Sequence, residues 1–218
     1  MSSNLDYAAL RAEMVARQLR PRGIRDERVL AAMGRVPREL FVLEPYRDRA
    51  YEDGALPIGF DQTISQPYMV AATCELLGLS GDENVLEVGT GSGYAAAVLA
   101  ELAACVTTIE RVPELAAQAR ESLAAAGYTS VEVVVGDGSL GVPERAPFHA
   151  IAVAAAAPRV PESLYHQLVP GGRLVVPIGS RADQRLALVV RTLEGPAEVR
   201  SMPCRYVPLV GAEGFEPR

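Results

Sequence analysis

The feature that most constrains the fold is a strand-like run that ends in three closely spaced glycines. Residues 84–88 read Asn-Val-Leu-Glu-Val, and Gly89, Gly91 and Gly93 follow at alternate positions before an alanine-rich helical pattern. Glycine has no Cβ, so such a turn can take positive φ and let the backbone approach a ligand closely. The stretch therefore predicts a strand, a tight ligand-binding turn and a helix.

The spacing of these glycines indicates the class of ligand. The dinucleotide fingerprint is G-x-G-x-x-G, and in this chain the third glycine comes one residue too early. Glu87 would also place a carboxylate beside the turn, where it attracts the ammonium group of S-adenosylmethionine and repels a diphosphate. We therefore expect S-adenosylmethionine as the cofactor, although a G-x-G-x-G run by itself can also be an ordinary flexible loop.

The rest of the chain alternates strand-like and helix-like patterns. After the first strand, further strands are expected at residues 106–110, 131–135, 150–153 and 173–177. Helices are expected between them at residues 113–126 and 161–168. Such alternation builds a parallel sheet with helices on both faces. Three later strand-like runs have no helix between them and predict antiparallel strands: 186–192, 197–201 and 205–209. The expected fold class is α/β, a doubly wound, mostly parallel sheet with N-terminal helices and an antiparallel C-terminal edge.

Two short helices should precede the sheet. Asn4 or Asp6 can cap the first, and the second should begin at Asp26 and stop before Val36-Pro37. Acidic residues are interleaved with the arginines of this part, so we expect solvated helical faces rather than a nucleic-acid footprint. These arginines are Arg11, Arg17, Arg20, Arg22, Arg25, Arg28, Arg35 and Arg38.

Composition favours one soluble domain. No linker divides the 218 residues, so we expect a single domain with N-terminal helices and an active-site loop (1–66), a cofactor-binding core (67–182) and C-terminal strands (183–218). The net charge of −6 argues against nucleic acid, and the absence of a long apolar run or signal-peptide pattern argues against a membrane or export. The three separated cysteines suggest neither disulfides nor a metal site. We expect a cytoplasmic monomer without metal.

Polar residues just past the strands form the natural list of ligand contacts, because the ligand of a doubly wound sheet lies beyond the carboxyl ends of the strands. Glu110, followed by Arg111, comes about 20 residues after the glycine turn, where an acidic residue can accept both ribose hydroxyls. The alternative for Glu110 is a solvent-facing strand end. Asp137, beside Gly138, can accept from an adenine amino group, although Gly-Asp-Gly alone is only a turn signal.

The segment from Leu56 to Met69 is interpreted as an irregular loop that enters a helix at Pro67. Ser65 lies just before this helix, whose free N–H groups and dipole attract an anion, so a carboxylate acceptor could be held there. A plain N-cap serine is the alternative. Residues 154–158 offer no side-chain acceptor for a target NH₂ group, which disfavours an exocyclic amine as the methyl acceptor.

The chain resembles the protein-L-isoaspartate (D-aspartate) O-methyltransferase family. Gln62-Thr-Ile-Ser-Gln-Pro-Tyr-Met-Val-Ala71 is the most specific match, and the other matching runs follow the family's order over nearly the whole chain: 36–42, 55–59, 85–94, 136–138, 146–148 and 206–209. The resemblance implies methyl transfer from S-adenosylmethionine to the free α-carboxylate of L-isoaspartyl residues, which repairs damaged proteins and peptides. A relative that methylates normal aspartate in a dedicated peptide, and a cofactor-binding scaffold without catalysis, remain alternatives.

The resemblance also implies roles for individual residues, with Ser65 as the catalytic residue. The implied cofactor contacts are Gln62, Thr63, Ile64, Ser65, Glu87, Gly89, Gly91, Gly93, Glu110, Arg111, Asp137 and Gly138. The implied substrate contacts are Ile64, Ser65, Val207, Pro208 and Leu209. The chain departs from the family pattern at His149, where an aspartate is usual, and at residues 154–158; neither departure replaces a residue with an assigned role.

Overall fold

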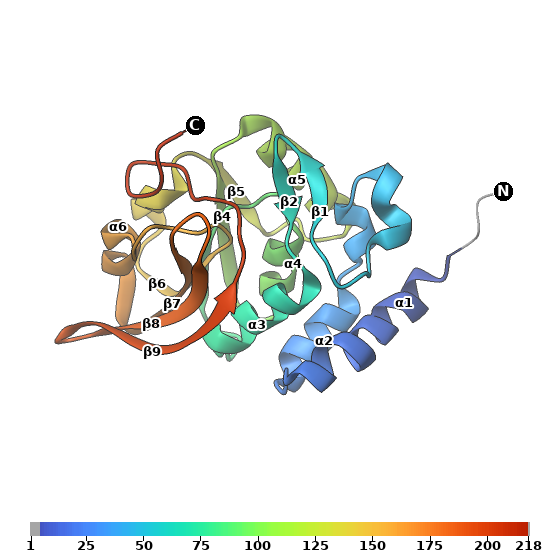
Figure 1. The fold of residues 1–218 in the computed structure, drawn as a ribbon, viewed down its shortest axis with the longest axis horizontal. Coiled ribbons are helices and arrows are strands. Elements are labelled where there is room, and N and C mark those ends of the chain that lie inside the picture. Colours follow the sequence, from blue (N-terminus) through green and yellow to red (C-terminus); the bar gives the residue numbers. More distant parts are fainter. Residues whose placement is uncertain (1–4, 218) are drawn as a thin grey trace.

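The computed structural model describes residues 5–217 and contains a seven-stranded sheet with the order β5-β4-β3-β6-β7-β8-β9 (Figure 1). Five strands run parallel to one another: β3 (Asn84–Val88), β4 (Cys105–Glu110), β5 (Glu132–Val135), β6 (Phe148–Val153) and β7 (Leu168–Gly179). The last two, β8 (Gln184–Thr192) and β9 (Gly195–Cys204), pair antiparallel at one edge. The predicted α/β class, with a mostly parallel sheet and an antiparallel C-terminal edge, is confirmed.

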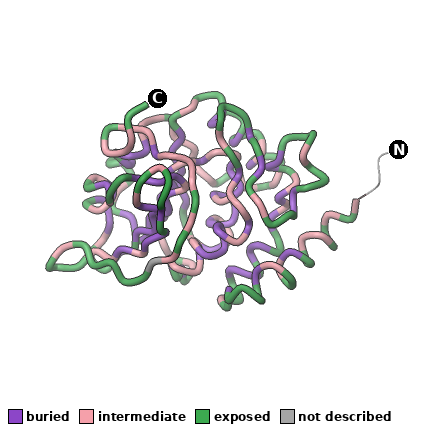
Figure 2. The backbone as a smooth tube through the Cα atoms, viewed as in Figure 1, coloured by how far each residue is buried: buried purple, intermediate pink, exposed green. Residues whose placement is uncertain are grey.

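Apolar side chains fill both faces of the sheet, because successive residues of a strand point to opposite sides. In β6, Ala150 and Ala152 pack on one face, while Ile151 and Val153 pack on the other. The first face is covered by α3 (Pro67–Leu77), α4 (Tyr94–Ala100) and α5 (Pro113–Ala125), and the second by α6 (Glu162–His166). Figure 2 shows this buried centre between exposed loops. None of the helices within residues 5–217 has the length and apolar character needed to cross a bilayer.

The N-terminal helices pack on the first face and start where the sequence predicts. The Asp6 side chain caps α1 (Tyr7–Met14) by accepting a hydrogen bond from Ala9 N at 3.0 Å. Asp26 caps α2 (Glu27–Arg35), which ends before Pro37. The alternative cap, Asn4, lies outside the described residues.

The expectation that all the N-terminal arginines are solvated is wrong for two of them. Arg17 is exposed and pairs with Glu13, but Arg38 is completely buried. The side chain of Arg11 is only 15% exposed, in an ion pair with Glu39. Burial is possible because partners from distant parts of the chain accept hydrogen bonds from both guanidinium groups.

Residues 56–64 are not an irregular loop. They form a small antiparallel hairpin, β1 (Leu56–Gly59) and β2 (Gln62–Ile64), separate from the main sheet. Its turn residues Phe60 and Asp61 both have positive φ, 53° and 56°. Glycine or asparagine usually marks such a turn, so Phe-Asp gives no local hairpin signal. The prediction that α3 begins at Pro67 is confirmed.

The prediction of a third C-terminal strand at residues 205–209 is also wrong. After β9 the chain leaves the sheet edge and runs back over the carboxyl ends of the parallel strands (Figure 1). It is held there by two hydrogen bonds, from Ala156 N to Val207 O at 2.8 Å and from Leu209 N to Ala156 O at 2.7 Å. The buried Gln184 amide pairs with both the N–H and the carbonyl of Tyr206. The segment therefore covers the end of the sheet instead of widening it.

Candidate active site

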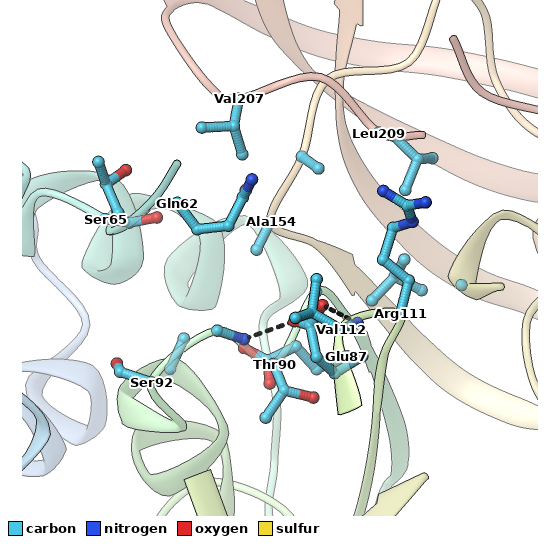
Figure 3. A pocket seen from close by; sticks show the side chains of 18 of the residues that line it. Gln62, Ser65, Glu87, Thr90, Ser92, Arg111, Val112, Ala154, Val207 and Leu209 are labelled. Atoms are coloured by element: carbon cyan, nitrogen blue, oxygen red, sulfur yellow. Dashed lines mark hydrogen bonds between the residues drawn. The ribbon is translucent and has the colours of Figure 1, made fainter. Parts of the chain in front are cut away.

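A pocket lies at the carboxyl ends of β3, β4 and β6, between the β1–β2 hairpin and the C-terminal segment. Figure 3 shows Gln62 and Val207 reaching into it from the hairpin side and the C-terminal side, with Glu87 and Thr90 beneath them. Most residues singled out in the sequence line this pocket together: Gln62, Thr63, Ile64, Ser65, Glu87, Gly89, Gly91, Glu110, Arg111, Gly138, Val207, Pro208 and Leu209.

Two of the residues predicted to contact the cofactor lie outside the pocket lining. Gly93 precedes α4 with φ 88°, and a Cβ there would lie 3.1 Å from Leu123 Cγ, so its smallness serves the packing of α4 on α5. Asp137 accepts hydrogen bonds from Ala212 N at 2.7 Å and from Ser139 N at 2.9 Å. Burial alone would raise the pKa of Asp137, but these hydrogen bonds outweigh it and the pKa is lowered. The carboxylate thus anchors the C-terminal segment.

The glycine turn has the backbone that its sequence predicts. Gly89 and Gly91 have φ values of 93° and 53°, in the left-handed region that favours glycine. A Cβ on Gly91 would lie 3.2 Å from Cδ1 of Ile58 in the hairpin. The hairpin therefore packs directly against the turn, and any side chain at residue 91 would disturb both.

Glu110 joins the ends of β3 and β4. Its Oε2 accepts from Gly91 N at 2.9 Å and its Oε1 accepts from Val112 N at 3.0 Å (Figure 3). With 7% exposure, Glu110 is not a solvent-facing strand end. A carboxylate oxygen can accept two hydrogen bonds, so the geometry leaves acceptor capacity toward a ligand hydroxyl.

Glu87 is a buried carboxyl group on the pocket floor, 1% exposed. Thr108 Oγ1 donates to its Oε2 at 2.6 Å, and Thr108 in turn lies 2.7 Å from Thr90 Oγ1. Burial raises the pKa of Glu87 to about 8; the Thr108 hydrogen bond partly opposes this shift, and the charge of Glu110 adds to it. A cation bound in the pocket would favour the ionised form.

The raised pKa of Glu87 predicts how stability depends on pH. Folding favours the protonated carboxyl group, so its contribution to the free energy of unfolding is complete below pH 4.5 and is lost as the pH rises through about 8. Glu87→Gln removes the titration, so the melting temperature of the ligand-free variant should fall less than that of the wild type between pH 5 and pH 8. If the melting temperatures of the two proteins changed in parallel with pH, ionisation of Glu87 would not destabilise the folded state.

Ser65 is not the cap of α3. The N-cap is Gln66, which makes no side-chain capping bond. Ser65 lies at the junction of the pocket and a neighbouring open groove of about 610 Å³, which Tyr68, Met202 and Arg205 also line. Its carbonyl oxygen accepts from Arg38 Nη2 at 2.8 Å. The serine therefore faces both spaces from a segment whose backbone is tethered.

Sequence reasoning missed several lining residues. Thr90 and Ser92 lie between the chosen glycines, so the same motif contained them. Val112 could have been found because it follows the end of β4. Ala154 belongs to the segment 154–158, which was already considered from the sequence. Val70 is apolar and lies within a helix, so the search for polar residues past the strand ends could not identify it. Within residues 5–217, no group of three or more His, Cys, Asp or Glu side chains is arranged to hold a metal ion.

His149 stands at the opposite end of the sheet from the pocket. It is the second residue of β6, and its Nδ1 accepts a hydrogen bond from Asn84 N, at the start of β3, at 3.0 Å. Val153, where the strand ends, is about 13 Å away along an extended chain. We expect His149→Gln to retain most of the single-turnover rate of the methyl transfer that the sequence predicts. A loss of two or more orders of magnitude in a folded variant that binds cofactor would contradict this placement.

Comparison with known proteins finds relatives that match nearly the whole chain. The family model described as Protein-L-isoaspartate(D-aspartate) O-methyltransferase matches residues 10–214. Protein-L-isoaspartate O-methyltransferase 2 of Marinobacter nauticus is 56% identical over 212 residues, which cover 96% of this chain and 97% of that protein. The protein-L-isoaspartate O-methyltransferase of Methanoculleus marisnigri is 54% identical over 208 residues, 94% of each chain.

Solved structures show the same fold. A protein-L-isoaspartate O-methyltransferase superimposes with a TM-score of 0.84 at 30% identity, over 93% of this chain and 67% of that one. A Plasmodium falciparum protein in complex with S-adenosyl-L-homocysteine gives a TM-score of 0.81 at 24% identity, over 92% and 98% of the two chains. Since the family model spans nearly the whole chain and relatives exceed half identity, the chain belongs to the protein-L-isoaspartate(D-aspartate) O-methyltransferase family.

Proposed function

We propose that this protein transfers the methyl group of S-adenosylmethionine to the free α-carboxylate of L-isoaspartyl residues in damaged proteins and peptides, and so acts in protein repair. The observation that carries the proposal is the position of Ser65. It lies where the pocket beside the glycine turn opens into the outer groove. A cofactor in the first space and a peptide in the second would meet at this residue.

The pocket suits a cationic nucleoside. Backbone at Gly89 and Gly91 leaves room for close approach, while Glu87 and Glu110 supply acidic groups at the floor and rim. Apolar atoms of Val88, Ile109 and Leu209 complete the lining and suit a purine ring. The similar Plasmodium falciparum structure holds S-adenosyl-L-homocysteine. S-adenosylmethionine supplies an electrophilic methyl group on a sulfonium centre.

We assign cofactor contact to the predicted residues that line the pocket, and an indirect role to the two that do not. Gly93 would keep α4 against α5, and Asp137 would keep the C-terminal segment closed over the pocket. Val207, Pro208 and Leu209 would then shield the reacting atoms from water and contact the substrate.

Methyl transfer to a carboxylate requires little from the protein beyond alignment of the reacting atoms. An α-carboxylate has an ordinary pKa of roughly 3 to 4, so it is already ionised at neutral pH and needs no general base. The Ser65 hydroxyl would donate a hydrogen bond to one carboxylate oxygen and hold the other in line with the methyl group, about 3 Å away. The other oxygen would attack the methyl carbon as its bond to sulfur breaks, which would give the methyl ester and release S-adenosylhomocysteine.

The test compares three peptides that differ at one residue: isoaspartyl, normal aspartyl and asparaginyl. Incubated with methyl-labelled S-adenosylmethionine, only the isoaspartyl peptide should gain label, and mild base should release the label as methanol because an ester has formed. Equal labelling of the normal aspartyl peptide would instead support the dedicated-peptide alternative. Binding of S-adenosylhomocysteine without labelling of any peptide would support the non-catalytic scaffold.

We further propose that the protein works as a cytoplasmic monomer and binds neither nucleic acid nor membrane. The net charge of −6 favours repulsion from nucleic acid and from anionic lipid. Sedimentation equilibrium at assay concentrations should give the mass of one chain; the mass of a dimer would contradict the proposed oligomeric state.

A further inference from the structure

We propose that Arg38 is a positioning residue that fixes Ser65 relative to the glycine turn. The inference rests on the proposed function, in which Ser65 contacts the acceptor carboxylate. Arg38 itself does not line the pocket. It would act through the backbone of the Ser65 segment.

The guanidinium group ties two segments that are distant in sequence. Nε donates to the carbonyl of Ala50 at 2.7 Å, and Nη2 donates to the carbonyl of Ser65 at 2.8 Å. Both bonds use backbone carbonyls, so they constrain the path of the chain. Because the tether takes the Ser65 carbonyl, it leaves the hydroxyl available to a ligand.

The same guanidinium also contacts the cofactor side of the site. Its central carbon lies 4.6 Å from the centre of the Tyr94 ring. Tyr94 is buried, begins α4 directly after Gly93, and itself lines the pocket. One side chain therefore links the serine segment to the helix that follows the glycine turn, which are the two parts that must be aligned for methyl transfer.

A contribution to folding stability does not by itself explain why Arg38 is buried. Arg38 is 0% exposed, and within residues 5–217 its Nη1 has no hydrogen-bond partner. Burial lowers the pKa of Arg38, but an arginine remains cationic at neutral pH. Burying an incompletely paired charge is costly. A requirement to hold Ser65 in place explains why a guanidinium occupies this position.

Lysine cannot reproduce the contact. Its ammonium is a single compact charge, whereas the planar guanidinium presents donors in two directions and stacks on an aromatic face. Arg38→Lys should thus keep the charge but hold only one of the two carbonyls. Arg38→Met removes the charge and both bonds at similar volume.

The decisive experiment combines kinetics, cofactor binding and hydrogen exchange on the full chain. Misplacement by about 1 Å can cost about two orders of magnitude in rate, so we expect Arg38→Met to lower kcat at least tenfold and Arg38→Lys to lower it by less. S-adenosylhomocysteine affinity should fall by less than kcat, because the pocket lining also includes the glycine turn and Glu110, to which Arg38 makes no hydrogen bond. Amide exchange should accelerate at residues 62–66 and remain unchanged in the central strands.

Arg28→Met is the matched control. Arg28 also donates to two backbone carbonyls, those of Leu79 and Leu102, at 2.7 Å and 3.3 Å, but within residues 5–217 it makes no hydrogen bond to residues 62–66. This variant should leave kcat and exchange at residues 62–66 at wild-type values. In a Ser65→Ala background, Arg38→Met should cause little further loss, because the group that it positions is gone.

Wild-type turnover in Arg38→Met, or a further tenfold loss in the Ser65→Ala background, would overturn the proposal. So would faster exchange spread evenly over the chain. If Arg38→Met does not fold, Arg38→Lys provides the test. Wild-type kcat together with unchanged amide exchange at residues 62–66 in that variant would also overturn the proposal. If the wild type fails to methylate the isoaspartyl peptide, the proposed function fails, and local exchange in the Arg38 variants still decides whether this residue holds the segment.

Discussion

Gly91→Val is expected to abolish binding of S-adenosylhomocysteine in a protein that still folds. Residue 91 has φ +53°, which a β-branched residue rarely adopts, and a Cβ there would lie 3.2 Å from Ile58 Cδ1. The branches of valine would push the hairpin away or enter the pocket. Movement of the turn would also separate Gly91 N from Glu110 Oε2, now 2.9 Å apart. Titration calorimetry with S-adenosylhomocysteine measures the effect directly.

Gly127→Val separates backbone strain from loss of the ligand site. Gly127 also has positive φ, +87°, but nothing lies within 4 Å of a Cβ built there, and the residue is not part of the pocket. This control should lower the melting temperature while it binds S-adenosylhomocysteine normally. Wild-type affinity in a folded Gly91→Val protein would remove the glycine turn from the cofactor site.

Ser65→Ala is expected to lower the rate of methyl transfer by roughly 10- to 150-fold, the effect of losing a hydrogen bond worth about 1.5–3 kcal/mol to a charged group. Its melting temperature should stay close to that of the wild type, because Gln66, not Ser65, occupies the N-cap position. Single-turnover measurement with labelled S-adenosylmethionine isolates the chemical step from product release.

Ser130→Ala provides the control for Ser65→Ala, since Ser130 is an exposed turn residue outside the pocket and the outer groove. It should leave the rate unchanged. A wild-type rate in Ser65→Ala would show that the Ser65 hydroxyl does not hold the acceptor. Arg38 would then have no catalytic group to position.

Much of the fold could be predicted because its causes are local. Alternation of apolar strands and helices identified the parallel sheet, Pro67 marked the start of α3, and Asp6 and Asp26 marked two helix starts. Each signal acts through bonds or steric effects within a few residues. The positive φ values at Gly89 and Gly91 belong to the same group.

The candidate site was found in outline for a related reason. Parallel strands bring their carboxyl ends to one edge, so Glu87 and Glu110 had to meet there once the strands were identified. Ser65 was singled out as a residue before a helix, yet its relation to the pocket depends on where the hairpin packs. The Phe60-Asp61 turn lacks the glycine that normally signals a hairpin, so local chemistry did not indicate it.

The amino-acid sequence by itself determined the α/β sheet, the glycine turn and the acidic strand ends, because neighbouring residues are enough to specify them. Only the tertiary structure decided that Arg38 is buried against the carbonyls of Ala50 and Ser65, and that Asp137 holds Ala212. It likewise decided that residues 205–209 cover the site through Ala156. The physical reason is that a polar side chain or an extended segment can satisfy its hydrogen bonds with water or with protein, and folding alone brings the distant protein partners within reach.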